Sequence, residues 1–312
     1  MKQIKENVLS FSSISDLMRR LLLPAPLNPL ITLIDYDKVE LDLSDAGKWF
    51  SLDFYKISFK NNFYGSVRYG PGTYDFKDGG MAFLSPGQLV EMPGDPDDYQ
   101  GYALYFHPDL LSSYPLSQSI QRFGFFSYTV NEALFLSEKE RRTISSLFAA
   151  IHAELDNNID GFSGDVLVSQ IELLLNYSNR FYNRQFLTRK NHHHDLIDRM
   201  YKWLYGRFDL ADTSLTGLPS PHDIAAYLEV SQRYLSDMLK ALTGKTTQQH
   251  IHLVLIEKAK MLLSQSELTI AEIAYYLGFE HPQSFNKLFK LKTKVPPKIF
   301  RSIFQTIKIK NC

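Results

Sequence analysis

The stretch Asp223–Val230 reads DIAAYLEV, and 49 positions further on Glu272–Phe279 reads EIAYYLGF. Each copy has an acid, an Ile-Ala pair, a Leu four residues after the Ile, and a closing Val or Phe. This spacing gives a helix a narrow apolar face with a small alanine where a second helix can cross closely. The repeat therefore predicts two similar helices, each of which needs a partner at a steep angle.

A partner helix is expected after each copy. After the first copy, Ser231 is a candidate N-cap, and an apolar stripe at helical spacing ends at Gly244. After the second copy, Pro282 occupies a first helical position and a similar stripe follows. The leading helices have start signals of their own, which are Ser220, Pro221 and Asp223 in the first and Thr269 and Glu272 in the second. The sequence thus predicts helix-turn-helix units over residues 220–243 and 269–292.

Charge separates the chain into two parts. Residues 195–312 contain 16 Lys and Arg against 11 Asp and Glu, whereas residues 1–194 contain 18 against 23. After Glu280 there is no acid, while eight Lys and Arg follow. A helix whose polar face carries only basic and amide groups suits a phosphate-lined groove. The charge therefore favours DNA binding over the alternative, a helical hairpin repeat that only builds a bundle.

The stretch Leu268–Arg301, LTIAEIAYYLGFEHPQSFNKLFKLKTKVPPKIFR, resembles the pattern of the AraC/XylS family of bacterial transcription regulators. The matching elements are the Ile-Ala pair, Gly278-Phe279, Ser284-Phe285, Phe289-Lys290, Pro297 and Phe300-Arg301. The resemblance extends over residues 195–305, about a third of the chain. It implies two helix-turn-helix units joined by a long central helix over Thr246–Leu263. It also implies that both second helices enter successive major-groove segments on one side of a duplex.

Carried over residue by residue, the resemblance implies a set of DNA-contacting side chains. They are Gln232, Arg233, Ser236 and Asp237 on the first recognition helix, and Gln283, Ser284, Asn286 and Lys287 on the second, with Lys290 beside them. Arg233 suits guanine, Gln283 and Asn286 suit adenine, and Lys287 suits guanine or phosphate. Asp237 departs from the family, since many relatives carry Arg there. A carboxylate near phosphates weakens binding unless it accepts a hydrogen bond from N4 of cytosine.

The N-terminal part reads as a β-rich domain. Residues 30–110 are rich in Tyr, Phe, Val and Ile with frequent Gly and Pro, which predicts short strands in an antiparallel sandwich or barrel. Phe83–Pro93 and Tyr105–Leu111 resemble the cupin-like effector domain of many AraC relatives. Two helices follow, one from a capping box at Ser137 and Glu140 and one over Val166–Phe181. They either pack on the sheet or form a dimer contact. Arg68 is the candidate for binding a ligand.

The predicted fold class is α+β with two domains. Residues 1–185 form a cupin-like β barrel with flanking helices for effector sensing and dimerisation, residues 186–194 form a linker, and residues 195–312 form the all-α DNA-binding domain. The one cysteine is Cys312, and no signal peptide or membrane span is visible, so a cytoplasmic location is expected. One histidine in the sheet region, His107, argues against a metal cupin, and His192–His194 is interpreted as solvated linker. No catalytic residue, metal site or cofactor is predicted.

The leading functional interpretation is a sequence-specific transcription regulator, an activator as is usual in the family. Its expected partners are double-stranded DNA, an unidentified small-molecule effector, a second copy of the chain and RNA polymerase. Two alternatives from other classes stay open. In one, the cupin-like domain is an enzyme, against which the missing metal ligands argue. In the other, the chain is a small-ligand binding module that has lost DNA binding, for which Asp237 is the hint.

Overall fold

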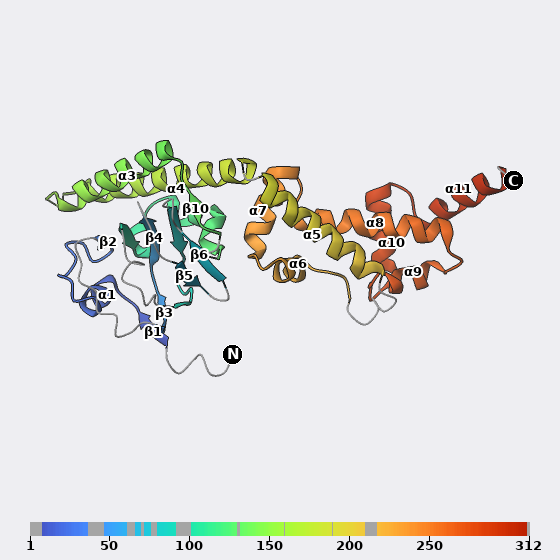
Figure 1. Cartoon of the computed structure of the whole chain (residues 1–312), viewed down its shortest axis with the longest axis horizontal. Helices are drawn as coiled ribbons and strands as arrows, with labels where there is room; N and C mark the ends of the chain where they lie inside the picture. Colours follow the sequence, from blue (N-terminus) through green and yellow to red (C-terminus); the bar gives the residue numbers. More distant parts are fainter. Residues whose placement is uncertain are drawn as a thin grey trace. The chain divides into compact units, whose positions relative to one another are not determined.

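The computed structural model describes residues 8–36, 47–60, 66–69, 72–75, 80–91, 101–129, 132–158, 160–188, 190–209 and 217–310 (Figure 1). The chain forms two compact units, Met1–Thr188 and Arg189–Cys312. None of the helices in the described part of the chain is long and apolar enough to cross a membrane.

The N-terminal unit contains two β-sheets and a separate hairpin. The larger sheet is antiparallel in the order β10-β7-β4-β9-β2, with β2 at Ile31–Asp35, β4 at Tyr55–Lys60, β7 at Gly80–Leu84, β9 at Tyr102–Phe106 and β10 at Leu134–Phe135. The smaller has the order β1-β3-β8, with β1 at Val8–Phe11, β3 at Trp49–Leu52 and β8 at Val90–Glu91. Strand β5, Ser66–Tyr69, pairs with β6, Gly72–Asp75. The predicted antiparallel strands are confirmed, except that β1 and β3 pair in parallel.

The two sheets share one apolar core. Because side chains alternate along a strand, one face of the larger sheet presents Ile34, Leu84 and Tyr105. These residues pack with Phe50 of β3 and with the helix α1, Ile14–Arg20. The arrangement is that of two layers closed over a common interior, as expected of a sandwich or barrel.

Two long helices cover the opposite face of the larger sheet. Helix α3, Glu138–Asp156, and helix α4, Ser163–Thr188, lie side by side along it (Figure 1). The ring of Phe148 on α3 lies 5.2 Å from that of Phe59 on β4. The capping box predicted at the start of α3 is confirmed. Shorter turns connect β9 to β10, namely η5 at Pro108–Leu111, α2 at Leu116–Ser119, η6 at Ile120–Arg122 and η7 at Gly124–Ser127.

The C-terminal unit is helical wherever regular structure is described. Its helices are α5 at Lys190–Asp209, α6 at Pro221–Leu228, α7 at Gln232–Thr243, α8 at Thr247–Gln265, α9 at Ile270–Tyr276, α10 at Pro282–Thr293 and α11 at Pro297–Lys310. The helices predicted from the repeat and its start signals are therefore present, as is the long central helix between them. Each pair, α6 with α7 and α9 with α10, is joined by a short turn.

The segment expected to be a linker, residues 186–194, holds the last turn of α4 and the first turn of α5. His193 on α5 is fully buried, and its Nε2 lies 3.2 Å from the hydroxyl of Tyr234 on α7. The interpretation of this histidine as solvated is therefore wrong. Its partner stands 41 residues later in the chain, so local sequence offered no signal of the contact. The side chain of His192 lies outside the described residues.

Candidate DNA-binding interface

The first helix-turn-helix unit is fixed by hydrogen bonds that the sequence predicted. The side chain of Ser220 accepts from the backbone N–H of Asp223 at 3.2 Å, and Asp223 accepts from the backbone N–H of Ser220 at 2.9 Å. The bond from the Ser220 backbone lowers the pKa of Asp223. Helix α6 ends at Glu229, whose φ of 59° is left-handed. Ser231 then caps α7 by accepting from the N–H of Tyr234.

The two helices of this unit cross through small and branched apolar residues. On α6, Ile224 and Ala225 are buried, and on α7, Leu235 and Met238 are fully buried. The alanine lets the second helix approach where a larger side chain would hold it away. The predicted apolar stripe on α7 is thus confirmed, and Gln232, Arg233 and Lys240 on the other side of the helix are exposed.

The second unit repeats this construction with a different turn residue. Thr269 and Glu272 form the predicted capping box at the start of α9. The left-handed position after α9 is Gly278, with φ of 87°. A Cβ added there would lie 2.8 Å from the carbonyl carbon of Gly217, which is backbone and cannot yield as a flexible side chain would. Glycine is therefore required at this turn by both conformation and space.

The expected contact residues of α7 lie at its solvent side. Gln232 and Arg233 are exposed, and Ser236 and Asp237 are half-buried. The Nε of Arg233 donates to Oδ2 of Asp237 at 3.0 Å, one helical turn away. Asp237 therefore holds the neighbouring cation on its own helix. The four positions share one face of α7, and their contact with DNA stays a prediction.

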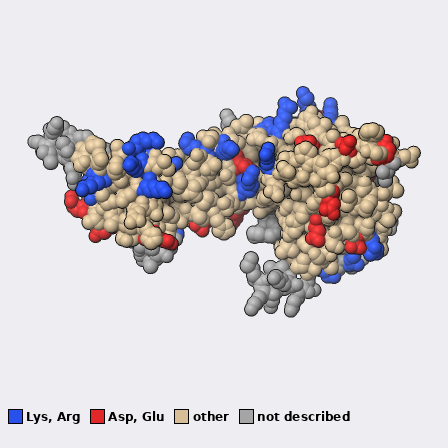
Figure 2. Space-filling view, turned by 180° about the vertical axis from the view of Figure 1, so that it is seen from behind, with Lys and Arg blue, Asp and Glu red and all other residues tan. Residues whose placement is uncertain are grey.

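The expected contact residues of α10 are all exposed, namely Gln283, Ser284, Asn286, Lys287 and Lys290. Behind them Phe285 and Phe289 are fully buried, with ring centroids 5.7 Å apart. The aromatic pair holds the helix against the unit so that amide and ammonium groups face outwards. Figure 2 shows Lys and Arg side chains gathered on one face of the C-terminal unit, at the left of the view. A polar face of this kind can contact base edges and phosphates.

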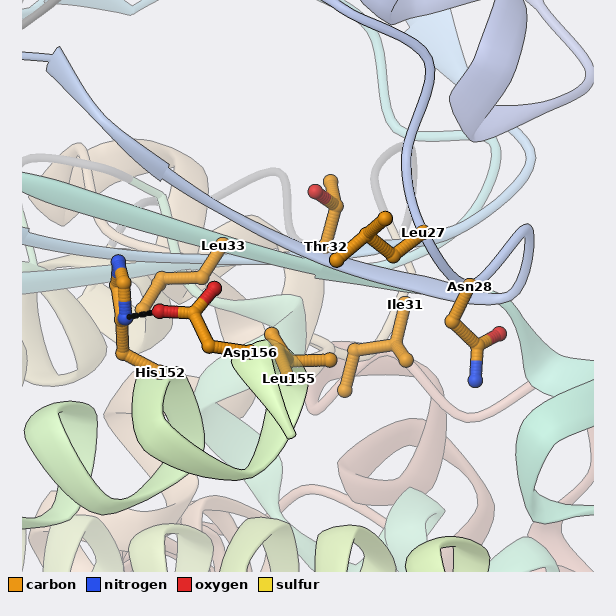
Figure 3. Close-up of a pocket in the computed structure, with 8 residues that line it drawn as sticks. All are labelled: Leu27, Asn28, Ile31, Thr32, Leu33, His152, Leu155 and Asp156. Carbon is orange, nitrogen blue, oxygen red and sulfur yellow. Dashed lines mark ion pairs between the residues drawn. The ribbon is translucent and has the colours of Figure 1, made fainter. Parts of the chain in front are cut away.

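In the N-terminal unit, the sequence predicted a ligand contact at Arg68. Arg68 lies on β5, but its side chain is outside the described residues. A cavity of about 90 Å³ opens between the edge strand β2 and helix α3. Figure 3 shows Leu33 and Leu155 beside an ion pair in which Nδ1 of His152 lies 2.8 Å from Oδ2 of Asp156. Small-molecule sites usually enclose about 300–1,000 Å³, so this cavity is too small for an effector.

A half-buried lysine in the larger sheet of the N-terminal unit was not among the predicted site residues. The ammonium of Lys56 on β4 lies 5.9 Å from the ring centre of Tyr36 and 5.6 Å from that of Tyr105. Burial lowers the pKa of Lys56 to about 8 and raises the pKa of Tyr36 to about 12. Local sequence gave no signal of this contact, because the alternation in Tyr55–Lys60 places Lys56 on the polar face of the strand with Ser58 and Lys60.

No group of three or more His, Cys, Asp and Glu side chains converges as metal ligands would in the part of the chain that the structure describes. The histidine weighed for a metal cupin, His107, instead caps a turn: its Nδ1 accepts from the N–H of Asp109 at 3.2 Å.

Family models match both units. Residues 224–303 match a helix-turn-helix domain, and residues 64–171 match the AraC-like ligand binding domain. The chain belongs to the AraC family. The resemblance seen in residues 268–301 is thus confirmed, and the fold class with it.

Two curated relatives and one solved structure illustrate the likeness. The HTH-type transcriptional activator RhaR of Cronobacter sakazakii is 32% identical over 87 residues, which are 27% of this chain and 31% of RhaR. RhaS of Escherichia coli O157:H7 is 33% identical over 78 residues, 25% of this chain and 28% of RhaS. The C-terminal domain of AraT, a response regulator from Geobacillus stearothermophilus, has 29% identity and a TM-score of 0.31 over 35% of this chain and 84% of that one. The chain spans less than a third of the length of these curated relatives.

Proposed function

We propose that this AraC-family protein is a sequence-specific DNA-binding transcription regulator and that it activates its targets, as the relatives RhaR and RhaS are named to do. One observation carries the proposal. The exposed face of α10 presents amides and ammonium groups without a carboxylate, on a helix fixed by buried Phe285 and Phe289. Amides pair bidentately with adenine, and lysines reach guanine or phosphate. The protein acts by binding and performs no chemical reaction of its own.

A gel-shift titration tests DNA binding. Full-length protein is titrated against the duplex upstream of its own coding sequence and against a shuffled duplex of equal length. The upstream duplex should bind more tightly by a factor of at least about 10³ at physiological salt, as specific sites do. The variant Asn286→Ala should reduce that preference, while Asn183→Ala, at an exposed asparagine of the N-terminal unit, should not. Equal affinity for both duplexes would refute sequence-specific binding.

The N-terminal unit is proposed to bind a small-molecule effector, in line with the AraC-like ligand binding domain that it matches. Lys56 supports an effector with an anionic group, because a cation enclosed between aromatic rings favours a negative partner. Thermal-shift screening of sugars and organic acids, on the wild type and on Lys56→Met, tests this. An organic acid that stabilises the wild type but not Lys56→Met supports Lys56 as an effector contact. An acid that stabilises the two proteins equally would show that Lys56 is not part of the effector site.

A second copy of the chain is proposed to pack on α4. Val166, Leu173 and Leu187 on this helix are exposed although apolar, and they recur at multiples of seven residues. Light scattering should find a dimer that Leu173→Glu converts to a monomer, while Glu172→Lys beside it leaves the dimer intact.

We further propose that the protein works in the cytoplasm, where it meets DNA and RNA polymerase.

A further inference from the structure

A groove lies beside the recognition face of the second helix-turn-helix unit. Its walls are the first residues of α9, one flank of α10 and the first residues of α11, and its volume is about 570 Å³. Ile270, Ala271 and three prolines give it an apolar floor. Lys287 and Lys290 of α10 and Lys298 of α11 also line the groove. Two consecutive helices thus contribute three lysines to the lining of one groove.

The groove contains no opposing negative charge. No carboxylate is among its lining residues, and the sequence has no Asp or Glu after Glu280. The nearest acid on α9 is Glu272, whose carboxylate accepts the backbone N–H of Thr269 at 2.6 Å in the capping box. All three lysines are exposed, so their ammonium groups are hydrated and can exchange that hydration for an anion.

We propose that this groove seats a backbone phosphate of the bound DNA, and that Lys298, outside the helix-turn-helix units, is a phosphate-contacting residue. This inference rests on the proposed function. A duplex read by Gln283 and Lys287 has its sugar-phosphate backbone along the flank of α10, since the backbone borders the major groove. Lys290 and Lys298 then hold one phosphate from two helices, which fixes the register of α10 on the bases.

The first unit supplies a matched contrast within the same chain. Counting 50 residues back, the three lysines correspond to Asp237, Lys240 and Gln248. That set has one cation and one anion where the second unit has three cations. A phosphate seat of this kind is therefore expected at the second unit and not at the first. The electrostatic part of DNA affinity should come mainly from α10 and α11.

The test measures the dissociation constant of the full chain for a duplex that the wild type binds, over a series of salt concentrations. Lys298→Ala should weaken binding at low salt and reduce the slope of log K against log salt by about 1, the value of one lost phosphate contact. Specific and shuffled duplexes should lose affinity equally, because phosphates carry no sequence information. Lys298→Arg should restore the slope.

Lys139→Ala, at an exposed lysine of α3, is the control for removing one positive charge, and circular dichroism confirms that each variant is folded. Wild-type affinity and slope in Lys298→Ala would overturn the phosphate seat while leaving the proposed function intact. Loss of transcription activation with unchanged DNA binding would also overturn it, since the occupant would then be a protein. A wild type that does not prefer its duplex over the shuffled one contradicts the proposed function itself.

Discussion

The two helix-turn-helix units have the same framework and different surfaces. Both leading helices begin with a capping box, and both turns pass through a left-handed residue, Glu229 in the first and Gly278 in the second. Both recognition helices also end at a left-handed residue, Gly244 and Lys294. The two units therefore share the caps of their leading helices and the left-handed residues, but they differ at the start of the recognition helix, where Ser231 caps α7 and His281 makes no side-chain cap on α10. Any difference between the units in DNA binding should come from their exposed side chains.

The exposed sides differ mainly in charge. In the first unit, Asp237 accepts a hydrogen bond from Arg233, so one cation is paired on its own helix. In the second unit the corresponding position is Lys287, and no acid follows Glu280. Together with the groove at Lys298, this difference in charge leads us to expect that the second unit binds phosphates more strongly. The first unit is expected to contribute base reading more than affinity.

The largest effect is expected at the turn of the second unit. Gly278→Val places a branched side chain in a left-handed conformation and against the backbone of Gly217, at a cost of about 3 kcal/mol or more. The variant should lose DNA binding. The chain has two tryptophans, Trp49 and Trp203, one in each unit. In a Trp49→Phe background, Trp203 fluorescence should report a destabilised C-terminal unit.

The matched control is a Trp203→Phe background, in which Trp49 reports on the N-terminal unit. The unfolding midpoint measured from Trp49 fluorescence should be the same with and without Gly278→Val. Normal DNA binding by Gly278→Val would mean that the close approach to Gly217 is not needed for the interface.

A second pair of variants tests the difference in charge. Lys287→Ala should weaken binding by roughly 1 to 3 kcal/mol if the lysine contacts guanine, with a relaxed preference at one base pair. If it contacts phosphate, the salt slope should fall by about 1 for every sequence. Asp237→Ala removes a carboxylate and the partner of Arg233, so affinity should stay equal or rise. Isothermal calorimetry over a salt series measures the DNA affinity of both variants. A larger loss of affinity in Asp237→Ala than in Lys287→Ala would mean that the first unit, not the second, contributes more to DNA affinity.

Much of this comparison could be predicted from the sequence, because caps, turns and apolar stripes depend on residues within a few positions of one another. The Arg233–Asp237 pair also had a local signal, its spacing of four on a helix, although the sequence analysis considered Asp237 only in relation to phosphates and cytosine. Other features needed the fold. The burial of His193 depends on packing against Tyr234, which is 41 residues away, and the approach of Lys298 to Lys290 depends on the angle between the consecutive helices α10 and α11. No periodicity encodes such contacts.

Acid should weaken the first unit more than the second. Nδ1 of His250 lies 2.7 Å from the hydroxyl of Tyr201, and its Nε2 lies 2.8 Å from that of Thr243. Burial, and then Lys245, hold the pKa of His250 below its usual value. The unfolded chain takes up the proton more readily than the folded one, so stability is lost as pH falls below the ordinary histidine pKa of about 6.5. The corresponding residue of the second unit is Phe300, which does not titrate.

Denaturant unfolding followed by Trp203 fluorescence between pH 7.5 and 5.5 checks this. The C-terminal unit should lose stability over this range, and His250→Gln, which keeps both hydrogen-bonding functions, should lose less. The pKa of His252 is also lowered by burial, so His252→Gln should reduce the acid sensitivity as well, and the double variant should reduce it further. If His250→Gln is as acid-sensitive as the wild type, the histidine is not the cause.

The smallest effect is expected at the first turn. Glu229 is exposed and left-handed, so it carries conformational strain that glycine would not. Glu229→Gly should stabilise the C-terminal unit by up to about 1 kcal/mol, with DNA affinity unchanged. Thermal unfolding measures the gain. A destabilised variant would show that the Glu229 side chain contributes more than its strained backbone costs.

Hydroxyl-radical footprinting of the full chain on its upstream duplex tests most directly whether both units read DNA. Two recognition helices on one framework should protect two segments of one duplex face, about 34 Å or one helical turn apart. Lys287→Ala should weaken protection over one segment first, and Arg233→Ala over the other. A single protected segment, or two segments that respond identically to both variants, would contradict an interface built from two distinct units.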